Sequence, residues 1–194
     1  MIAAIILAAG ESSRLGFAKQ TLLYKGKTLL ELAMEAALKS KCSPVVVVLG
    51  ANADKIAPGI NDTSITILQN SDWQEGMASS IRMAMIHIQN NVAIDSAVVM
   101  LCDQPFVNRA LIDSLIYQQQ KTGSAIVACA YKDTVGVPVL FKRSLFSELL
   151  TLQGQEGAKK IIAKYRNILA TIPFEKGGID IDTLSDYEDL INNT

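Results

Sequence analysis

The sequence predicts an α/β fold of three layers, in which helices cover both faces of a mostly parallel β-sheet. Short apolar runs rich in β-branched residues alternate with longer segments whose apolar residues recur at helical spacing. The expected strands are apolar at nearly every residue, which is typical of parallel strands buried on both faces. Hydrophobic residues make up 49% and charged residues 19% of the 194 residues, a composition that fits a folded α/β domain.

Seven strands and six helices are expected along the chain. The strands are predicted at residues 2–7, 45–49, 65–68, 97–101, 125–130, 137–141 and 168–173. The helices are predicted at residues 29–39, 79–88, 109–120, 144–150, 158–165 and 185–191. The chain shows no internal repeat, low-complexity tract or linker, so we expect a single domain over residues 1–194.

The composition argues against several classes of protein. A net charge of −1 gives no bulk basic field for nucleic acid, and no apolar run approaches the roughly 20 residues that a membrane span needs. Cys42, Cys102 and Cys129 lack Cys-x-x-Cys spacing, which argues for the reducing cytoplasm and against a disulfide framework or a zinc site. The single histidine, His87, cannot form a two-histidine metal site, and no Ser/His/Asp triad can be assembled. We therefore expect a cytoplasmic protein without nucleic-acid or membrane partners.

The loop after the first strand has the parts of a polyphosphate site. The small residues at 8–10 let a ligand approach the backbone closely. Arg14 and Lys19 add two cations to this glycine- and serine-rich loop, and exposed backbone N–H groups with such cations bind phosphates. The loop is neither a Walker A loop, which needs Gly-Lys-Ser/Thr, nor a Gly-x-Gly-x-x-Gly fingerprint. A plain surface turn is the alternative, but two cations inside the loop favour a phosphate site.

This segment resembles the signature LAAG-x-S-x-R-x-G-x-x-K of the MobA-like NTP transferases. Its LAAG start is more similar to molybdenum cofactor cytidylyltransferases than to the guanylyltransferases. The resemblance implies a Rossmann-like, nucleotide-diphospho-sugar transferase-like fold whose loop binds the NTP triphosphate. It implies that Arg14 and Lys19 are catalytic and bind the nucleotide. The other nucleotide-binding residues that it implies in this loop are Leu7, Ala8, Ala9, Gly10 and Ser13. The proline that often precedes the lysine is replaced here by Phe17-Ala18.

A second motif covers residues 70–82. Gly76 permits a tight turn, and the serines that follow suit either plain helix capping or contact with a polar ligand. The stretch is similar to the family segment EGM-x-x-S-[LIV]-R, which helps to hold the base and ribose. On that basis the nucleotide-binding residues also include Gly76, Met77, Ser79 and Ser80. Trp73 fits the core and the rim of a site equally well.

Two further motifs supply carboxylates for Mg²⁺. Asp103 stands at the end of the apolar strand predicted at 97–101, and hard carboxylate oxygens together with substrate phosphates suit Mg²⁺. Its alternative role is to cap the next helix. The string Leu-x-Asp-Gln-Pro is similar to the family's metal-binding strand end, which gives Asp103 catalytic, nucleotide-binding and metal-binding roles. Asp180 and Asp182 alternate and would share one face of an extended segment. The resemblance matches Asp182 to the second metal ligand, with Asp180 a weaker candidate and a plain polar loop as the alternative.

The remaining motif joins Gly136-Val137-Pro138 to residues 154–160. It is similar to the family's Gly-x-Pro-x-x-Phe and Gly-Asp-x-Gly-Ala-Arg/Lys segments, which lie where the second substrate binds. Gln155 stands here in place of the usual aspartate, which puts the identity of the acceptor in question more than the chemistry. Lys159 and Lys160 could attract an acidic acceptor, and a solvated helix face explains them equally well.

The resemblance implies nucleotidyl transfer without a protein nucleophile. A phosphate of the acceptor attacks the α-phosphorus of the NTP, pyrophosphate leaves, and the enzyme positions the reactants and neutralises charge. The implied donor is CTP and the acceptor is molybdopterin, giving molybdopterin cytosine dinucleotide, with a molybdenum hydroxylase apoenzyme as a further partner. The alternatives are the same chemistry with GTP or another phosphorylated acceptor, or a non-catalytic chaperone that delivers the cofactor to such hydroxylases.

Overall fold

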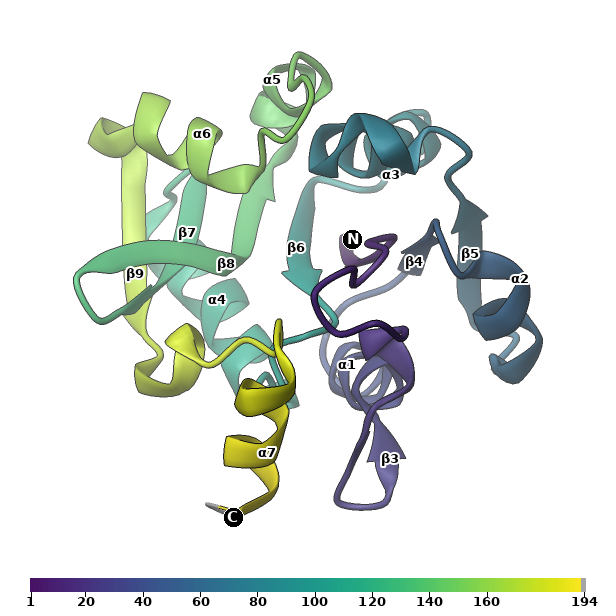
Figure 1. The fold of residues 1–194 in the computed structure, drawn as a ribbon. Helices are drawn as coiled ribbons and strands as arrows, with labels where there is room; N and C mark the ends of the chain where they lie inside the picture. The colour runs from purple at the N-terminus through teal and green to yellow at the C-terminus, as the bar shows by residue number, and fades with distance from the viewer. Residues whose placement is uncertain (193–194) are drawn as a thin grey trace.

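The computed structural model describes residues 1–192 and has a seven-stranded sheet between two layers of helices (Figure 1). The strand order is β5-β4-β1-β6-β8-β7-β9. All neighbouring pairs are parallel except those that β8 makes with β6 and β7, so the predicted three-layer, mostly parallel fold is confirmed. The strands are β1 (Ile2–Ala8), β4 (Val45–Leu49), β5 (Ile65–Gln69), β6 (Ser96–Leu101), β7 (Ile126–Tyr131), β8 (Thr134–Lys142) and β9 (Leu169–Pro173).

The antiparallel strand β8 follows from the length of its connection. Only Lys132 and Asp133 separate it from β7, and two residues can form a hairpin but not the crossover that parallel strands require. Lys132 has the positive φ, 49°, that such tight turns use. The hairpin pairs Thr134 with Tyr131, so the strand begins three residues before the predicted start at residue 137.

The two helical layers follow from the alternation of side chains along the strands. Ala4 and Ile6 of β1 face the apolar cluster beneath one layer, and Ala3 and Ile5 face the cluster beneath the other. One layer contains α1 (Leu29–Leu38) and α4 (Arg109–Thr122), and the opposite layer contains α3 (Met77–Gln89), α5 (Phe146–Leu150) and α6 (Ala158–Lys164) (Figure 1). Every predicted helix is present, with its ends shifted by two residues or fewer.

Two small elements were not predicted. The hairpin of β2 (Leu23–Tyr24) and β3 (Lys27–Thr28) follows the signature loop, and its turn has positive φ at Lys25 and Gly26. The one-turn helix α2 (Ala53–Ile56) follows β4. Segments this short contain too few residues to show a periodic apolar pattern, so the sequence alone gives little sign of them.

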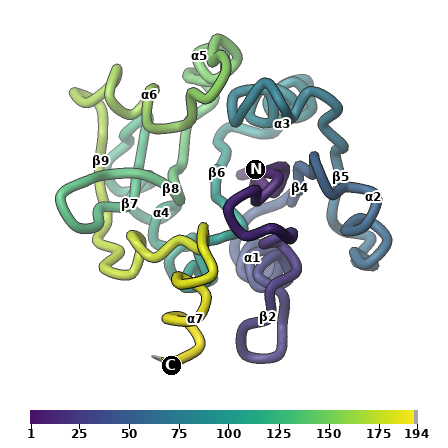
Figure 2. The backbone as a smooth tube through the Cα atoms, in the orientation of Figure 1, coloured from purple at the N-terminus to yellow at the C-terminus, as the bar shows by residue number. Residues whose placement is uncertain are grey.

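The C-terminal segment returns to the N-terminal loop, as Figure 2 shows. The Ile181 N–H donates to the Asp103 carbonyl at 3.1 Å, and the Ile181 side chain is fully buried. Helix α7 (Leu184–Asn192) lies beside the β2–β3 hairpin, where the Tyr187 hydroxyl donates to the Leu23 carbonyl at 2.8 Å. The segment is held in a third apolar cluster formed by Leu15, Leu22, Tyr24, Leu29, Ile181 and Leu190. Residues near position 181 are therefore fixed at the end of β6.

Three further properties of residues 1–192 bear on the sequence predictions. Cys42, Cys102 and Cys129 are free and buried. Over the same residues, no helix combines the length and apolar character required to cross a membrane. The expectation of one domain over residues 1–194 stays a prediction, and positions 193 and 194 lie outside the described residues.

Candidate active site

The loop after β1 is folded so that Lys19 returns to the end of that strand. Ser12 has a φ of 60°, and its carbonyl accepts hydrogen bonds from the N–H groups of Leu15 (2.9 Å) and Gly16 (3.2 Å). Leu15 is buried in the third apolar cluster, which anchors the middle of the loop. The Ser12 hydroxyl then accepts from the Lys19 N–H at 3.1 Å. Local turn formation and one apolar anchor thus set the position of Lys19.

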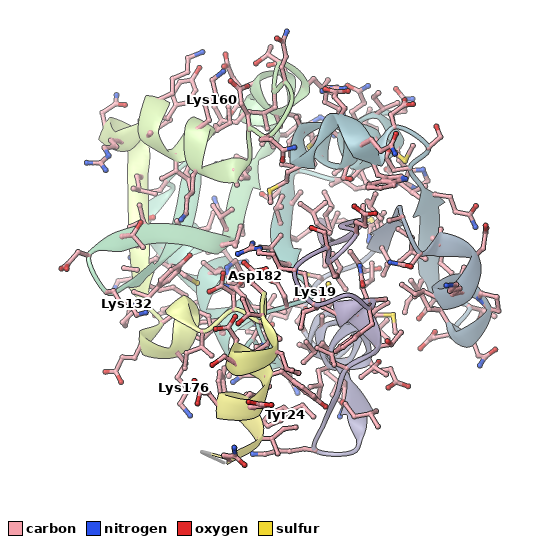
Figure 3. All side chains as sticks on the ribbon, viewed as in Figure 1. Lys19, Tyr24, Lys132, Lys160, Lys176 and Asp182 are labelled. Atoms are coloured by element: carbon pink, nitrogen blue, oxygen red, sulfur yellow. The ribbon has the colours of Figure 1, made fainter. Side chains whose placement is uncertain are left out.

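Four charged side chains from three parts of the chain meet beside this loop. The Lys19 Nζ atom lies 2.5 Å from Asp103 Oδ2 and 2.9 Å from Asp182 Oδ1, so one ammonium group contacts both carboxylates. Arg14 Nη2 lies 3.0 Å from Asp182 Oδ2. Figure 3 shows Lys19 and Asp182 meeting in the centre of the molecule. The two carboxylates predicted as metal ligands are therefore brought within reach of a single cation.

Burial controls the charges of this cluster. Burial by itself lowers the pKa of Lys19, but the Asp103 carboxylate and the hydrogen bonds to Asp103 and Asp182 outweigh it and raise that pKa. Burial raises the pKa of Asp103, and the nearby Lys19 offsets only part of the shift. Asp182 is more exposed, and its hydrogen bond from Lys19 lowers its pKa. Lys19 is therefore a charged ammonium held against a desolvated carboxyl group.

The cluster lies in a cavity of about 700 Å³, here called the nucleotide cavity. The Asp103 side chain is only 9% exposed, and its Oδ1 atom is buried without a hydrogen-bond partner. Almost every sequence-predicted site residue lines this cavity, namely Leu7, Ala8, Ala9, Gly10, Ser13, Arg14, Lys19, Gly76, Met77, Ser80, Asp103 and Asp182. Ser79 and the weaker metal candidate Asp180 do not line it.

Ser79 instead stabilises the start of α3. Its hydroxyl donates to the Gly76 carbonyl at 2.8 Å and accepts from the amide of Asn70 at 2.8 Å. The same Asn70 amide donates to the Ser80 hydroxyl at 2.9 Å. Gly76 has a φ of 124°, and a Cβ atom there would lie 2.4 Å from the Gly154 carbonyl oxygen. Glycine at 76 is therefore required both by its backbone conformation and by close contact with a neighbouring loop.

A smaller cavity of about 370 Å³, here called the second cavity, lies next to the nucleotide cavity. The two share Leu7, Met77, Leu101 and Gln155. The second cavity is lined by residues of the motif expected to receive the second substrate, including Val137, Gly157 and Lys159. Asp180 also lines it, so Asp180 and Asp182 are placed in different cavities.

The two neighbouring lysines of α6 have different environments. Lys159 lines the second cavity, whereas Lys160 forms a surface ion pair with Glu156 at 2.5 Å (Figure 3). The solvated-face interpretation therefore applies to Lys160.

Sequence reasoning missed several residues of the site. Gln20 and Gln74 line the nucleotide cavity, and so does Trp73, which the sequence could not assign to core or rim. Asn70 organises Ser79 and Ser80 from a fully internal position. For Gln20 the available signal was its position directly after the signature lysine.

Comparison with known proteins identifies the family. The model of the MobA-like NTP transferase domain matches residues 4–168. Nicotine blue oxidoreductase of Paenarthrobacter nicotinovorans is 30% identical over 98% of this chain and 96% of its own. Molybdenum cofactor cytidylyltransferase of Escherichia coli is 34% identical over 44% of each chain. The crystal structure of Rv0371c from Mycobacterium tuberculosis has a TM-score of 0.84 at 29% identity, covering 100% of this chain and 99% of that one.

These similarities agree with the geometry of the site. The fold is that of the nucleotide-diphospho-sugar transferases, and the family signature lines the nucleotide cavity. The matched model spans most of the chain. The chain therefore belongs to the MobA-like NTP transferase family, a family of nucleotidyltransferases.

Proposed function

We propose that this protein transfers a cytidylyl group from CTP to the terminal phosphate of molybdopterin, or of a related phosphorylated acceptor, and releases pyrophosphate. The observation that carries the proposal is the cluster of Arg14, Lys19, Asp103 and Asp182 inside a cavity walled by the signature loop. Two cations and two carboxylates beside exposed backbone suit a nucleoside triphosphate better than an uncharged ligand.

The reaction needs no nucleophile from the protein. An acceptor phosphate oxygen attacks the α-phosphorus of the NTP, the bond to the β-phosphate oxygen breaks, and pyrophosphate leaves. The work of the protein is to hold both reactants and to neutralise the negative charge of the phosphates. Arg14 and Lys19 supply positive charge, and the small residues 8–10 let the nucleotide approach the backbone.

The residues present fit a Mg²⁺ ion. Asp103 keeps one buried carboxylate oxygen without a partner, and Asp182 is held next to it by Lys19. No group of three or more His, Cys, Asp or Glu side chains within residues 1–192 could hold a metal by itself. Two carboxylates completed by substrate phosphates and water are the usual ligand set for Mg²⁺. When bound, the ion would neutralise charge on the phosphates.

A metal ion would also change the role of Lys19. Lys19 contacts Oδ2 of Asp103 and Oδ1 of Asp182, so it would share these two carboxylates with a bound ion. With the carboxylate charge partly neutralised by the ion, the ammonium group would interact more strongly with the triphosphate. The solved manganese complex of Rv0371c, 27% identical over the full length of this chain at a TM-score of 0.80, supports a divalent ion in a protein of this fold.

The choice of CTP and molybdopterin rests on sequence similarity. Ala9 follows the cytidylyltransferase form of the signature, and the Escherichia coli relative bears that activity in its name. The second cavity is the proposed acceptor site, and Gln155 lies where it meets the nucleotide cavity. The buried free thiols of Cys42, Cys102 and Cys129 support a reducing cytoplasmic location. A molybdenum hydroxylase apoenzyme is the proposed recipient of the product.

The experiment is to measure pyrophosphate release with each of the four NTPs, with and without molybdopterin, in the presence of Mg²⁺ or Mn²⁺. Release that requires both CTP and molybdopterin supports the proposal. A preference for GTP, or activity only with another phosphorylated acceptor, would keep the chemistry and replace the substrates. Nucleotide or cofactor binding without any release would favour the delivery chaperone. The similarity to nicotine blue oxidoreductase adds a redox alternative, tested by assaying the protein for oxidation or reduction of nicotine blue.

A further inference from the structure

Gln20 makes contacts that set it apart from the other side chains of the signature loop. It directly follows Lys19 in the short 3-10 turn η1 (Lys19–Thr21), and only 1% of it is exposed. Its Nε2 atom donates to the Ala8 carbonyl at 2.8 Å and to the Gly10 carbonyl at 3.0 Å. One side-chain amide therefore joins the end of the loop to its beginning and binds the backbone on both sides of Ala9.

These two hydrogen bonds set the direction of the neighbouring N–H groups. In a planar trans peptide, the C=O of one residue and the N–H of the next point in opposite directions. Because Gln20 binds the carbonyls of Ala8 and Gly10, the N–H groups of Ala9 and Glu11 point away from it. Ala9 and Glu11 both line the nucleotide cavity. The Ala9 carbonyl is bound separately by the Ala51 N–H at 3.2 Å, which fixes the intervening peptide as well.

The carbonyl oxygen of the Gln20 amide is in an unfavourable environment. Its Oε1 atom is buried and has no hydrogen-bond partner. An unpaired buried polar atom is unfavourable, and an apolar side chain of similar length would avoid it. Packing alone therefore does not explain glutamine at this position, whereas the two donated hydrogen bonds do.

We propose that Gln20 is a positioning residue for nucleotide binding, because it holds the Ala8–Gly10 backbone so that the Ala9 and Glu11 N–H groups face the nucleotide. The inference rests on the proposed function, since it assumes that an NTP occupies the nucleotide cavity. Gln20 acts through the backbone of the loop and donates both of its amide hydrogens to that backbone. A loop backbone that is already ordered loses less conformational entropy when the nucleotide binds. We therefore expect Gln20 to affect the Kd for the nucleotide.

The chain offers a matched control in Gln104. Its Nε2 atom donates to the carbonyls of Gly177 (3.0 Å) and Val137 (3.4 Å), and its Oε1 atom is also buried without a partner. Gln104 is 6% exposed, comparable to Gln20, but it lines only the second cavity. Replacing either glutamine by methionine removes the same kind of contact from a different cavity.

The experiment compares Gln20→Met, Gln104→Met and the parent by titrating CTP in the presence of Mg²⁺. Trp73 is the single tryptophan of the chain and lines the nucleotide cavity, so its fluorescence reports binding directly. Loss of two hydrogen bonds is expected to raise the Kd for CTP roughly 10-fold in Gln20→Met. Gln104→Met should raise the Kd for CTP clearly less than Gln20→Met does, because its hydrogen bonds go to Gly177 and Val137, outside this cavity. In steady-state assays, Gln20→Met should raise the KM for CTP and leave the KM for the acceptor unchanged.

Several outcomes separate the two proposals. If the parent protein does not bind any NTP, the proposed function fails. If the parent binds CTP and Gln20→Met binds it equally well, or if both methionine variants weaken it equally, the positioning role is wrong. Should Gln20→Met fail to fold, Gln20→Leu also removes the two donated hydrogen bonds without adding a charge and must show the same loss.

Discussion

Replacing Asp103 by asparagine should reduce catalysis far more than replacing Asp182 by asparagine. The Asp103 side chain is 9% exposed, and Asp103 lies two residues after β6 and keeps one buried oxygen without a partner. The Asp182 side chain is 32% exposed and is held by Lys19 and Arg14 from a loop. Charge interactions strengthen as water is excluded, so the buried carboxylate should contribute more to a bound metal ion and to the transition state.

The expected magnitudes follow from these two environments. Loss of a preorganised, desolvated electrostatic group costs roughly 100-fold or more in rate, about 3 kcal/mol. The more exposed Asp182 should cost about 10-fold, or about 1.4 kcal/mol, because solvent screens it. Asp103→Asn should change the melting temperature little. The variant loses the ion pair with Lys19 but no longer buries a charged carboxylate, and Lys19 keeps Asp182 as a partner.

The assay is pyrophosphate release at saturating CTP and acceptor across a Mg²⁺ titration. Both variants should need more Mg²⁺ for half-maximal rate, and Asp103→Asn should need the most. Asp54→Asn is the control, since Asp54 lies on α2 and does not line the nucleotide cavity. Equal rate losses in the two variants, or an unchanged Mg²⁺ requirement in both, would refute the shared metal site.

Three further perturbations test other parts of the structure. Lys19→Met should weaken CTP binding, measured by Trp73 fluorescence. It should also lower the free energy of unfolding, measured by urea denaturation, by about 3 kcal/mol, because it leaves Asp103 buried without its cation. Gly50→Ala should lower the free energy of unfolding by about 1–3 kcal/mol and weaken CTP binding. The reason is that the added Cβ would lie 2.5 Å from the Ala9 carbonyl oxygen and 2.7 Å from the Trp73 Cβ. A variant with parental stability and CTP affinity would contradict this packing. Asp186→Asn should destabilise the protein at neutral pH by about 1 kcal/mol, because Asp186 accepts hydrogen bonds from the N–H groups of Asp182 and Thr183 at the start of α7. The hydrogen bond from the Thr183 hydroxyl, followed by those from the two N–H groups, lowers the pKa of Asp186 below its usual value of 3.8. The stabilisation by Asp186 is therefore present above that pH and is lost as the pH falls through the lower pKa of the folded state. Melting curves of parent and variant should converge in acid.

The sequence by itself determined most of the fold and the position of the signature loop. Strands and helices show in local periodicity, and the residues that line the nucleotide cavity near β1 are contiguous in the chain. In parallel sheets the strand ends meet at one edge, so Asp103 could also be expected beside the loop from its place after an apolar strand. These predictions needed only neighbours in the sequence and one rule about sheets.

Tertiary structure alone decided which polar side chains face the cavity and which are internal. Ser79 and Ser80 are adjacent on a helix, where successive side chains differ by about 100° in direction. Both hydroxyls accept from the Asn70 amide, but Ser79 also donates to the Gly76 carbonyl, whereas Ser80 lines the cavity. Asp180 and Asp182 were expected on one face of an extended segment, but residues 179–182 form no strand, and the two carboxylates line separate cavities.

The partners of Lys19 and Gln20 were likewise decided by the folded chain. Both residues are polar and lie in a loop, so no periodic pattern distinguishes a buried side chain from a solvated one there. Asp182 is 163 residues from Lys19 in the sequence, and it reaches the ammonium group because Ile181 is buried and α7 packs on the β2–β3 hairpin. Local sequence specifies which elements form. The long-range packing of apolar residues such as Ile181 and Leu15 decides which charged groups those elements bring together.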